Sequence, residues 1–414
     1  MSGEALDDRN SAARLDGDAP VEDGRRPVYG RNFWIVFAAS FALNSAANLF
    51  VLFPLFIVQL GGSASSIGAI VGTGSLAALL ARPGAGFAID RRGRKWTALR
   101  FLVLDAAAIA LYLPIKGLGW PIYAVRIVHG AIDGTARVAL FAMVYGILPE
   151  GRQGEGMSIF SLCGMGSAVF GPIFGEMLIR YTGFEGFFIA SVALAASGAL
   201  TISALPDDGP AQIARSEQSD AAVGYGAMLR ERRLRPLWIV TLLFSLAISS
   251  RGSFLAPIAY ARGIGDVGAY FAIYSVTAVV ARLATGRVID RIGLARMIVP
   301  SLVTLGAGLG LVAATGHTGM LDLAAVLGGI GHGYLYPSLS GLVIARTAQN
   351  AMARSSTIYM SLYDLGAMAG PYLLGIVGEY GGYGSVFIAA GMFTITAAGY
   401  FLAVEPSARR RRLA

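Results

Sequence analysis

The chain has 414 residues, of which 55% are hydrophobic and only 14% carry a charge. Soluble domains carry roughly 25% charged residues, so this composition excludes an ordinary water-soluble protein and indicates one that crosses a membrane several times. The single cysteine, Cys163, excludes an intramolecular disulfide bond and a cysteine metal cluster. In a membrane protein the positions of positive charges matter more than the net charge of +8, and we expect no nucleic-acid partner.

Twelve apolar runs follow one another along the chain, and each can cross a bilayer, which takes about 20 helical residues. Continuous runs of this length predict helices, because a membrane β-barrel would show short alternating strands. The sequence therefore predicts an all-α integral membrane protein with twelve transmembrane helices in two six-helix bundles. The runs fall near 33–59, 66–89, 97–115, 120–147, 156–179, 184–204, 236–258, 266–289, 297–315, 320–345, 355–378 and 384–404.

Polar segments separate the two groups of six runs and flank them at both ends. We expect residues 1–31 to form a disordered cytoplasmic N-terminal tail. Residues 205–234 are predicted to be a cytoplasmic linker, whose second part can form an interfacial helix. The bundles then cover residues 32–204 and 235–404, and residues 405–414 form a basic cytoplasmic tail.

Arginine and lysine are concentrated in alternate loops, and the positive-inside rule turns this bias into an orientation. It predicts that both termini are cytoplasmic, in the cytoplasmic (inner) membrane of a cell. The opposite side holds Lys116, Arg180 and Arg262 and little else. The segments on the predicted cytoplasmic side hold Arg91, Arg92, Arg94, Lys95, Arg152, Arg230, Arg232, Arg233, Arg291, Arg346, Arg354 and Arg409 to Arg412.

A charged motif occurs twice, at the same place in each half. GFAIDRRGRK, from Gly86 to Lys95, returns 200 residues later as GRVIDRIGLAR, from Gly286 to Arg296. A second pair, GPIFGE from Gly171 and GPYLLGI from Gly370, recurs with an offset of 199. Parallel six-helix repeats predict two pseudo-symmetric bundles with binding sites near the midplane between them.

These repeated residues resemble motifs of the major facilitator superfamily, in particular its drug and metabolite efflux members. The resemblance covers about residues 32 to 404 and implies alternating-access transport. In the family, the loop after the second helix helps to hold the outward-open state. The residues that carry the resemblance are the gating motif Gly86, Asp90, Arg91, Gly93, Arg94 and Lys95, its echo Gly286, Asp290, Arg291 and Gly293, and the helix-packing motif Gly171, Pro172, Gly175, Gly370 and Pro371.

The chemistry of the gating motif suggests a role for several of its members. Gly86 can let its helix approach a neighbour closely, and Gly93 suits a turn with positive φ. Asp90 can cap the next helix or accept from an arginine. The echo has Leu294 and Ala295 in place of the last basic pair and should be the weaker latch. Alternatively, the charges serve only to anchor the loop in the cytoplasm.

Ionisable residues within predicted spans are candidate functional residues. Arg126, Asp133 and Arg137 are spaced to share one helical face, with His129 beside them. The repeat offset maps Asp133 to His332 and Arg137 to Tyr336, so Asp133 and His332 are a candidate pair for proton coupling. Alternatively, Asp133 neutralises an arginine of its own helix, and His332 is a hydrogen-bonded core residue.

Four more polar positions are expected near the central pathway or beside it. Arg251 of the seventh span maps to Asn48 of the first, and it suits an anionic substrate group or a pairing with Asp133. Asn44 and Asn48 can bind substrate or a neighbouring helix. Arg82 of the second span requires a neutralising acid, for which Asp105 and Asp364 are the candidates.

No nucleotide-binding loop, metal-ligand cluster or nucleophile–base pair occurs in the sequence, so we expect neither an enzyme nor a primary pump, and no cofactor or metal. The first hypothesis is proton-coupled efflux, that is antiport, of a small organic solute. The second is proton-coupled uptake of a small organic anion bound by Arg126 and Arg251. The third is a non-transporting sensor or assembly protein. The expected partners are a small-molecule substrate, protons and the lipid bilayer, and we expect a monomer.

Overall fold

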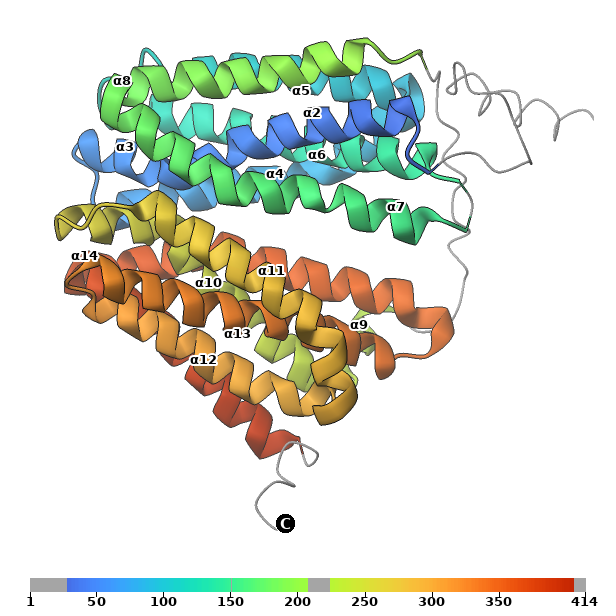
Figure 1. The fold of residues 1–414 in the computed structure, drawn as a ribbon, viewed down its shortest axis with the longest axis vertical. Coiled ribbons are helices and arrows are strands. Elements are labelled where there is room, and N and C mark those ends of the chain that lie inside the picture. The colour runs from blue at the N-terminus through green and yellow to red at the C-terminus, as the bar shows by residue number, and fades with distance from the viewer. Residues whose placement is uncertain (1–27, 150, 208–223, 406–414) are drawn as a thin grey trace, which may run out of the picture. The chain divides into compact units, whose positions relative to one another are not determined.

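The computed structural model describes residues 28–149, 151–207 and 224–405. In this part of the chain every regular element is a helix (Figure 1). The elements of the first half are α2 (Arg31–Leu49), η1 (Phe50–Leu52), α3 (Phe53–Gln59), α4 (Ala64–Arg92), α5 (Arg94–Ala110), α6 (Trp120–Ile147), α7 (Gln153–Phe160) and α8 (Leu162–Ser203). Those of the second half are α9 (Tyr225–Arg230), α10 (Arg235–Ala261), α11 (Val267–Ile292), α12 (Leu294–Ala314), α13 (Thr318–Ala345), η2 (Gln349–Ala351) and α14 (Met352–Val404).

Two of these elements, α8 and α14, each contain two predicted spans. The backbone leaves the helical conformation at Gly183, with φ 68°, and at Gly382, with φ 75°. Only glycine adopts such positive φ values without strain, so these residues let the chain turn between consecutive spans. With α8 and α14 divided there, helix occupies all twelve predicted spans. The all-α class is confirmed, and the span count agrees with the prediction.

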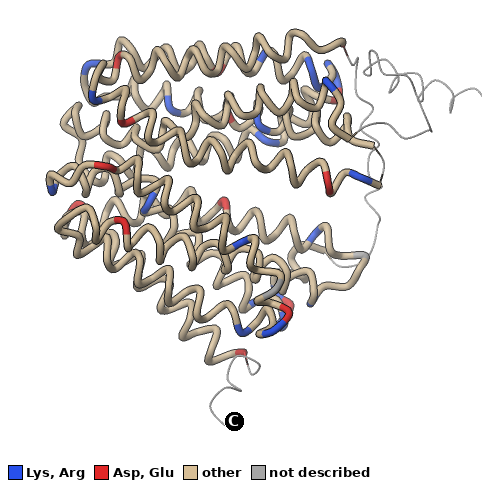
Figure 2. Tube along the Cα trace, viewed as in Figure 1, with Lys and Arg blue, Asp and Glu red and all other residues tan. Residues whose placement is uncertain are grey.

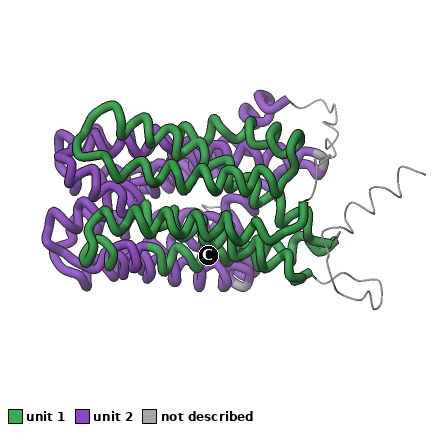
Figure 3. The backbone as a smooth tube through the Cα atoms, turned by 90° about the horizontal axis from the view of Figure 1, so that it is seen from above, with its two compact units in different colours: residues 1–50, 76–171, 177–219 green, residues 51–75, 172–176, 220–414 purple. Residues whose placement is uncertain are grey.

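The chain forms two compact units, which Figure 3 colours separately. One contains residues 1–50, 76–171 and 177–219, and the other contains residues 51–75, 172–176 and 220–414. We call them unit 1 and unit 2. Besides the C-terminal half, unit 2 therefore contains the end of the first predicted span, the start of the second and five residues of the fifth. The predicted bundle boundaries remain a prediction.

The predicted polar segments lie largely beyond the described residues. This applies to residues 1–27 of the N-terminal tail, to residues 208–223 of the linker and to residues 406–414 of the basic tail. The short helix α9 forms within the second part of the linker, where helix was expected.

Membrane helices approach closely where side chains are small, and α13 shows this on two faces. A Cβ added to Gly331 would lie 2.5 Å from the backbone nitrogen of Leu305 on α12. A Cβ added to Gly333 would lie 2.6 Å from the carbonyl oxygen of Ala278 on α11. The GGIGHG segment therefore holds three helices in backbone contact, as expected for packing glycines.

Charged residues gather near helix ends in both units (Figure 2). The junction of α4 and α5 carries Arg91, Arg92, Arg94 and Lys95, and the junction of α11 and α12 carries Arg291 and Arg296. Charges at mid-helix positions are sparser, which is the distribution that the cost of burying charge in lipid imposes. The few that occur there define the candidate site.

Candidate functional site

The first cluster lies in unit 1 and joins Asp133 and Arg137 of α6 to Asn44 of α2. Arg137 donates from Nε to Asp133 Oδ2 at 2.8 Å and from a second nitrogen to Oδ1 at 3.0 Å. Its remaining terminal nitrogen donates to Asn44 Oδ1 at 2.9 Å. A bidentate pair of this kind fixes both side chains and stabilises the ionised carboxylate. The arrangement is the predicted alternative in which Asp133 neutralises an arginine of its own helix.

Asn48 contacts its neighbouring helix. Its amide nitrogen donates to Asn44 O at 2.8 Å and to Ser167 Oγ on α8 at 3.1 Å. Gly171 lies beside it, since a Cβ added there would be 2.7 Å from Asn48 Cβ. Of the two roles predicted for Asn48, the structure shows the contact with a neighbouring helix.

A second cluster in unit 1 surrounds His129 of α6. Its Nδ1 lies 3.2 Å from the hydroxyl of Tyr112, and its Nε2 lies 3.5 Å from Asp105 Oδ1 on α5. Arg126 lies over the Phe50 ring at 5.9 Å and forms a side-chain hydrogen bond with Tyr112. Asp105 was one of two candidates, with Asp364, for the acid that neutralises Arg82. The structure instead packs it against His129, because α5 and α6 are neighbouring helices.

The third cluster lies in unit 2 around Arg251 of α10. The guanidinium carbon lies 4.1 Å from the ring centroid of Tyr274 and 5.1 Å from that of Phe271, both on α11. Its Nε is buried without a hydrogen-bond partner among the described residues. Within that same part of the chain no carboxylate forms an ion pair with it. Arg251 is therefore a cation held by aromatic faces.

His332 and Tyr336 of α13 belong to the same aromatic group. The Nδ1 of His332 lies 2.9 Å from the Tyr274 hydroxyl, as in the predicted core alternative. Arg282 stacks over the Tyr336 ring at 5.5 Å, which gives this arginine an aromatic partner. The sequence analysis did not identify the extent of this cluster, although four tyrosines and a phenylalanine recur on three helices. The aromatic residues in ring contact around His332 and Tyr336 are Phe244, Tyr270, Tyr274, Tyr359 and Tyr363.

The glycine turns of the repeated motif are alike. Gly93 has φ 86° and Gly293 has φ 88°, and each precedes the first residue of a helix. The prediction that Gly93 supports a turn with positive φ is confirmed. Two other expectations are wrong: a Cβ on Gly86 or Gly286 would meet nothing within 4 Å, and no side chain caps α5.

The aspartates of the motif are exposed and lie inside α4 and α11, while Gly93 and Gly293 occupy the N-cap positions of the next helices. Asp90 and Asp290 form no ion pair or hydrogen bond within the described residues. Arg91 stacks on Phe87, one turn earlier, with 4.2 Å between its guanidinium carbon and the ring centroid. The prediction that Asp90 caps the next helix is therefore wrong. Asp90 is exposed, and its neighbour Arg91 stacks on Phe87.

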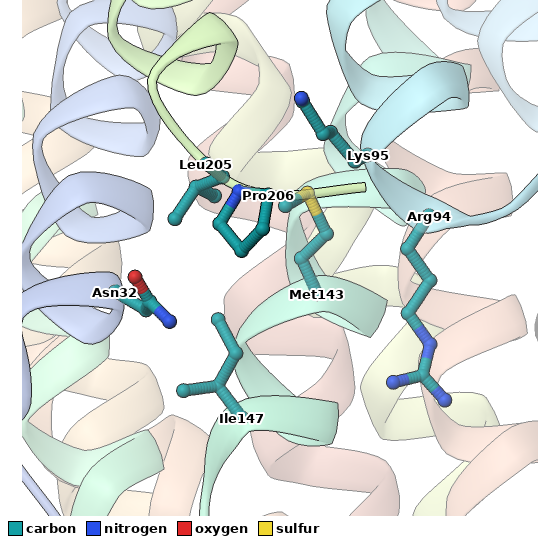
Figure 4. Close-up of a pocket in the computed structure, with 7 residues that line it drawn as sticks. All are labelled: Asn32, Arg94, Lys95, Met143, Ile147, Leu205 and Pro206. Atoms are coloured by element: carbon teal, nitrogen blue, oxygen red, sulfur yellow. The ribbon is translucent and has the colours of Figure 1, made fainter. Parts of the chain in front are cut away.

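The basic pair of the motif reaches α6 and the end of α8. Arg94 and Lys95 line a small pocket with Met143, Ile147 and Leu205 (Figure 4). Lys95 Nζ lies 3.1 Å from Asp207 Oδ1, whose side chain is 88% exposed. These contacts join the α4–α5 junction to two other helices of unit 1.

In both halves, the residue that follows the glycine of the gating motif packs against a glycine of a neighbouring helix. A Cβ on Gly146 of α6 would overlap the guanidinium of Arg94, and a Cβ on Gly341 of α13 would lie 3.1 Å from Leu294 Cδ2. Arg94 and Leu294 are therefore equivalent in both sequence and packing. The echo keeps the packing of the motif and loses its charge.

Replacing Lys95 by glutamine is expected to change the melting temperature of the purified protein by about 2 °C or less. Its partner Asp207 is largely solvated, and such ion pairs contribute little. A fluorescence-based thermal unfolding curve measures the shift. A loss of more than about 5 °C would show that the pair stabilises the helix junction more strongly than an exposed ion pair can.

The helix-packing motif places glycines in close contacts in both halves. Gly370 lies against α10, because its added Cβ would be 2.8 Å from Ser249 Cβ and 3.0 Å from Leu246 O. Together with Gly171, it confirms the predicted close-packed seam. Pro172 and Gly175 are buried in α8, and Pro371 is buried in α14. The non-helical backbone of these two elements lies at Gly183 and Gly382.

Two glutamates that the sequence analysis assigned no role cap helices in unit 2. Glu176 of α8 accepts from the backbone nitrogens of Val267 at 3.3 Å and Gly268 at 2.6 Å, at the start of α11. Glu379 of α14 accepts from the nitrogen of Ser65 at 3.0 Å, at the start of α4. Carboxylates are favoured there because the first N–H groups of a helix lack partners within it.

We expect Glu176→Gln to lower the melting temperature by about 2–4 °C, which corresponds to about 1 kcal/mol for a charge at a partly buried helix N-terminus. Glu185→Gln is the matched control, since Glu185 belongs to the same element, is exposed and has no hydrogen bond within the described residues. Thermal unfolding of both variants gives the comparison. Equal shifts would contradict the capping role.

Comparisons with known proteins agree with this architecture. The family model of the Major Facilitator Superfamily matches residues 34–266 and 237–414. The chain is 25% identical over 394 residues to the multidrug resistance protein MdtG of Dickeya zeae (strain Ech586), covering 90% of this chain and 93% of that protein. It is 23% identical over 368 residues to the staphylopine export protein of Staphylococcus aureus (strain Mu50 / ATCC 700699), covering 86% and 90%.

A solved structure with a similar fold is that of the nucleoside transporter NupG. It matches with a TM-score of 0.76 and 17% sequence identity, covering 90% of this chain and 99% of that chain. At this identity the match concerns the fold alone. The helical architecture, the repeated motifs and the family match lead to one conclusion: the chain belongs to the Major Facilitator Superfamily and is a multi-pass membrane transporter, not an enzyme.

Proposed function

We propose that this transporter exports small aromatic organic anions by alternating access, in exchange for protons. The observation that carries the substrate class is Arg251. It is a cation that rests on two aromatic rings, and it has no carboxylate ion pair in the described chain. An anionic substrate group would supply the charge partner that the protein leaves out.

The residues around Arg251 support the proposal that the substrate contains an aromatic ring. Tyr274 and Phe271 contact the guanidinium, and Tyr363, Tyr336 and Phe244 extend the aromatic cluster. Aromatic rings favour offset or edge-to-face contact with another ring. An arginine beside such rings suits a planar molecule that carries a negative charge at one edge.

The names of the relatives support export as the direction. The staphylopine export protein, MdtG and the multidrug efflux pump Tap of Mycobacterium bovis each match this chain over 86–90% of its length. Because these relatives are bacterial, we place the chain in the cytoplasmic membrane. The loop charges support cytoplasmic termini through the positive-inside rule.

Proton coupling is the less direct part of the proposal. The sequence singles out Asp133 and His332, and each has a partner in its own unit: Arg137 for Asp133 and Tyr274 for His332. Both oxygens of Asp133 accept from Arg137, so exchange of a proton there requires the pair to separate. The exchange of protons for substrate therefore has to be measured directly.

Purified protein in proteoliposomes with an acidic lumen tests the proposal. The probe is radiolabelled 2-naphthalenesulfonate, an aromatic anion that stays ionised at every pH used and so is not trapped by the pH gradient. An antiporter should accumulate it inside, and empty liposomes should not. Methanesulfonate, which lacks a ring, and tetraphenylphosphonium, which is cationic, serve as competitors that should not inhibit.

The direction of the gradient distinguishes the remaining alternatives. Accumulation only when the outside is acidic would overturn export and indicate proton-coupled uptake. Inhibition by tetraphenylphosphonium but not by other aromatic sulfonates would overturn the anionic substrate class. Absence of movement under either gradient would overturn transport of this class of molecule.

A further inference from the structure

A buried carboxyl–imidazole pair in unit 1 is assigned no role in the substrate site proposed above. Asp105 of α5 is 1% exposed and His129 of α6 is 6% exposed. His129 Nε2 lies 3.5 Å from Asp105 Oδ1, and that oxygen has no hydrogen-bond partner among the described residues. The other imidazole nitrogen lies 3.2 Å from the hydroxyl of Tyr112, which is itself fully buried.

Aromatic residues of η1 and α8 pack around the pair, and the charged groups near it lie on α5 and α6 themselves. Phe50 of η1 packs edge-to-face on His129, with ring centroids 4.8 Å apart. Phe188 of α8 stacks on Tyr112 at 5.3 Å. The titratable and charged groups that face the pair within the described residues come from α5 and α6 and the turn after α5: Tyr112, Arg126, Asp133 and Arg137.

An ionised carboxylate in such a place would carry a charge that its surroundings do not compensate by hydrogen bonds, which is unfavourable. The pair avoids this cost when one proton is shared between the carboxyl and the imidazole. Asp133 differs because both of its oxygens already accept from Arg137. Asp105 can therefore bind a proton without breaking an ion pair with an arginine, whereas Asp133 cannot.

We propose that Asp105 carries the coupled proton and that His129 and Tyr112 conduct it. This rests on the proposed proton-coupled export. In the loaded state the Asp105 carboxyl donates to His129 Nε2, and His129 Nδ1–H faces the Tyr112 oxygen. On release, the carboxyl O–H bond breaks, its electron pair stays on Oδ1, and the proton bonds to Nε2.

The release step then continues through the other side of the imidazole. The Nδ1 proton passes to the Tyr112 oxygen while the Tyr112 hydroxyl proton passes to a water molecule, so His129 and Tyr112 both end neutral. Tyr112 is fully buried in this conformation, so the last transfer requires the alternate conformation of the transporter, in which water reaches the hydroxyl. Asp105 remains as a carboxylate that faces Nε2–H of His129, and the positive charge of Arg137 acts on it. The net result is one proton transferred from Asp105 to water.

Infrared difference spectroscopy of the purified protein during a pH change tests proton binding without any substrate. The protonated carboxyl C=O stretch is the readout, and Asp133→Asn is the matched control. We expect a carboxyl band that Asp105→Asn removes, that Asp105→Glu shifts, and that Asp133→Asn leaves in place. A band lost in Asp133→Asn and retained in Asp105→Asn would overturn the assignment.

Transport by the same variants links the proton to coupling. Asp105→Asn should lose accumulation of 2-naphthalenesulfonate in acid-loaded proteoliposomes at least tenfold, yet exchange internal for external probe within threefold of wild type. Retained exchange shows that the variant is folded and binds substrate. If accumulation persists, or if both activities fall together while Asp105→Glu also fails, Asp105 is not the coupling residue. A wild type that moves no probe overturns the proposed function, while the infrared result still decides the proton site.

Discussion

Arg251→Gln is expected to reduce accumulation of 2-naphthalenesulfonate at least tenfold. A hydrogen bond to a charged group contributes about 1.5–3 kcal/mol, which corresponds to about a 10- to 150-fold change in affinity. Glutamine retains a hydrogen-bonding amide at the site but no charge. Arg251→Lys restores the charge without the planar group that stacks on Tyr274, so it should recover only part of the activity.

Arg262 offers the matched control for this substitution. It lies at the end of the same helix and donates to the backbone oxygens of Thr315 and Ala313 at 2.7 Å each. Arg262→Gln should lower thermal stability and leave the apparent affinity for the probe within twofold. Concentration dependence of probe uptake separates the two effects. Equal loss of affinity in both variants would contradict a substrate contact at Arg251.

Arg137→Gln is expected to destabilise the protein by about 2 kcal/mol. The substitution leaves Asp133 in unit 1 without its cation, and removal of one partner of a fully buried pair costs about 3–5 kcal/mol. The side chains of Arg137 and Asp133 are 36% and 24% exposed, so the cost should be lower here. Thermal unfolding in detergent at neutral pH measures it.

The double variant Asp133→Asn with Arg137→Gln isolates the charge effect. It removes both charges and leaves two amides that can still hydrogen-bond, so most of the lost stability should return. Asn44 accepts from Arg137 in the wild type and can accept from the new amide as well. A double variant no more stable than Arg137→Gln would show that packing, not charge, dominates at this site.

Local sequence patterns predicted the backbone well. Apolar runs located twelve spans, since a helix in lipid must be apolar along most of its length. Gly93 was expected to support a turn with positive φ, and its φ is 86°; Gly293 of the echo has φ 88°. Gly171 and Gly370 were expected to pack helices, and both lie in close helix contacts.

The partners of the charged side chains were harder to predict, because they depend on which helices are neighbours. Asp105 was one of two candidates to pair with Arg82, and it lies beside His129, on the helix that packs next to its own. Glu176 and Glu379 received no role, yet both cap helices that begin about 90 and 310 residues away in the sequence. Asp90 was expected to form a cap or an ion pair and is exposed.

The sequence by itself determined the membrane class, the helical spans, the twofold repeat and the family, because these follow from composition, hydrophobic length and local motifs. Only the tertiary structure decided that Arg137 binds Asp133 and Asn44, that Arg251 rests on Tyr274, and that Asp105 faces His129. Spacing along a helix gives the face on which a residue lies, whereas its partner depends on the helix that packs against that face.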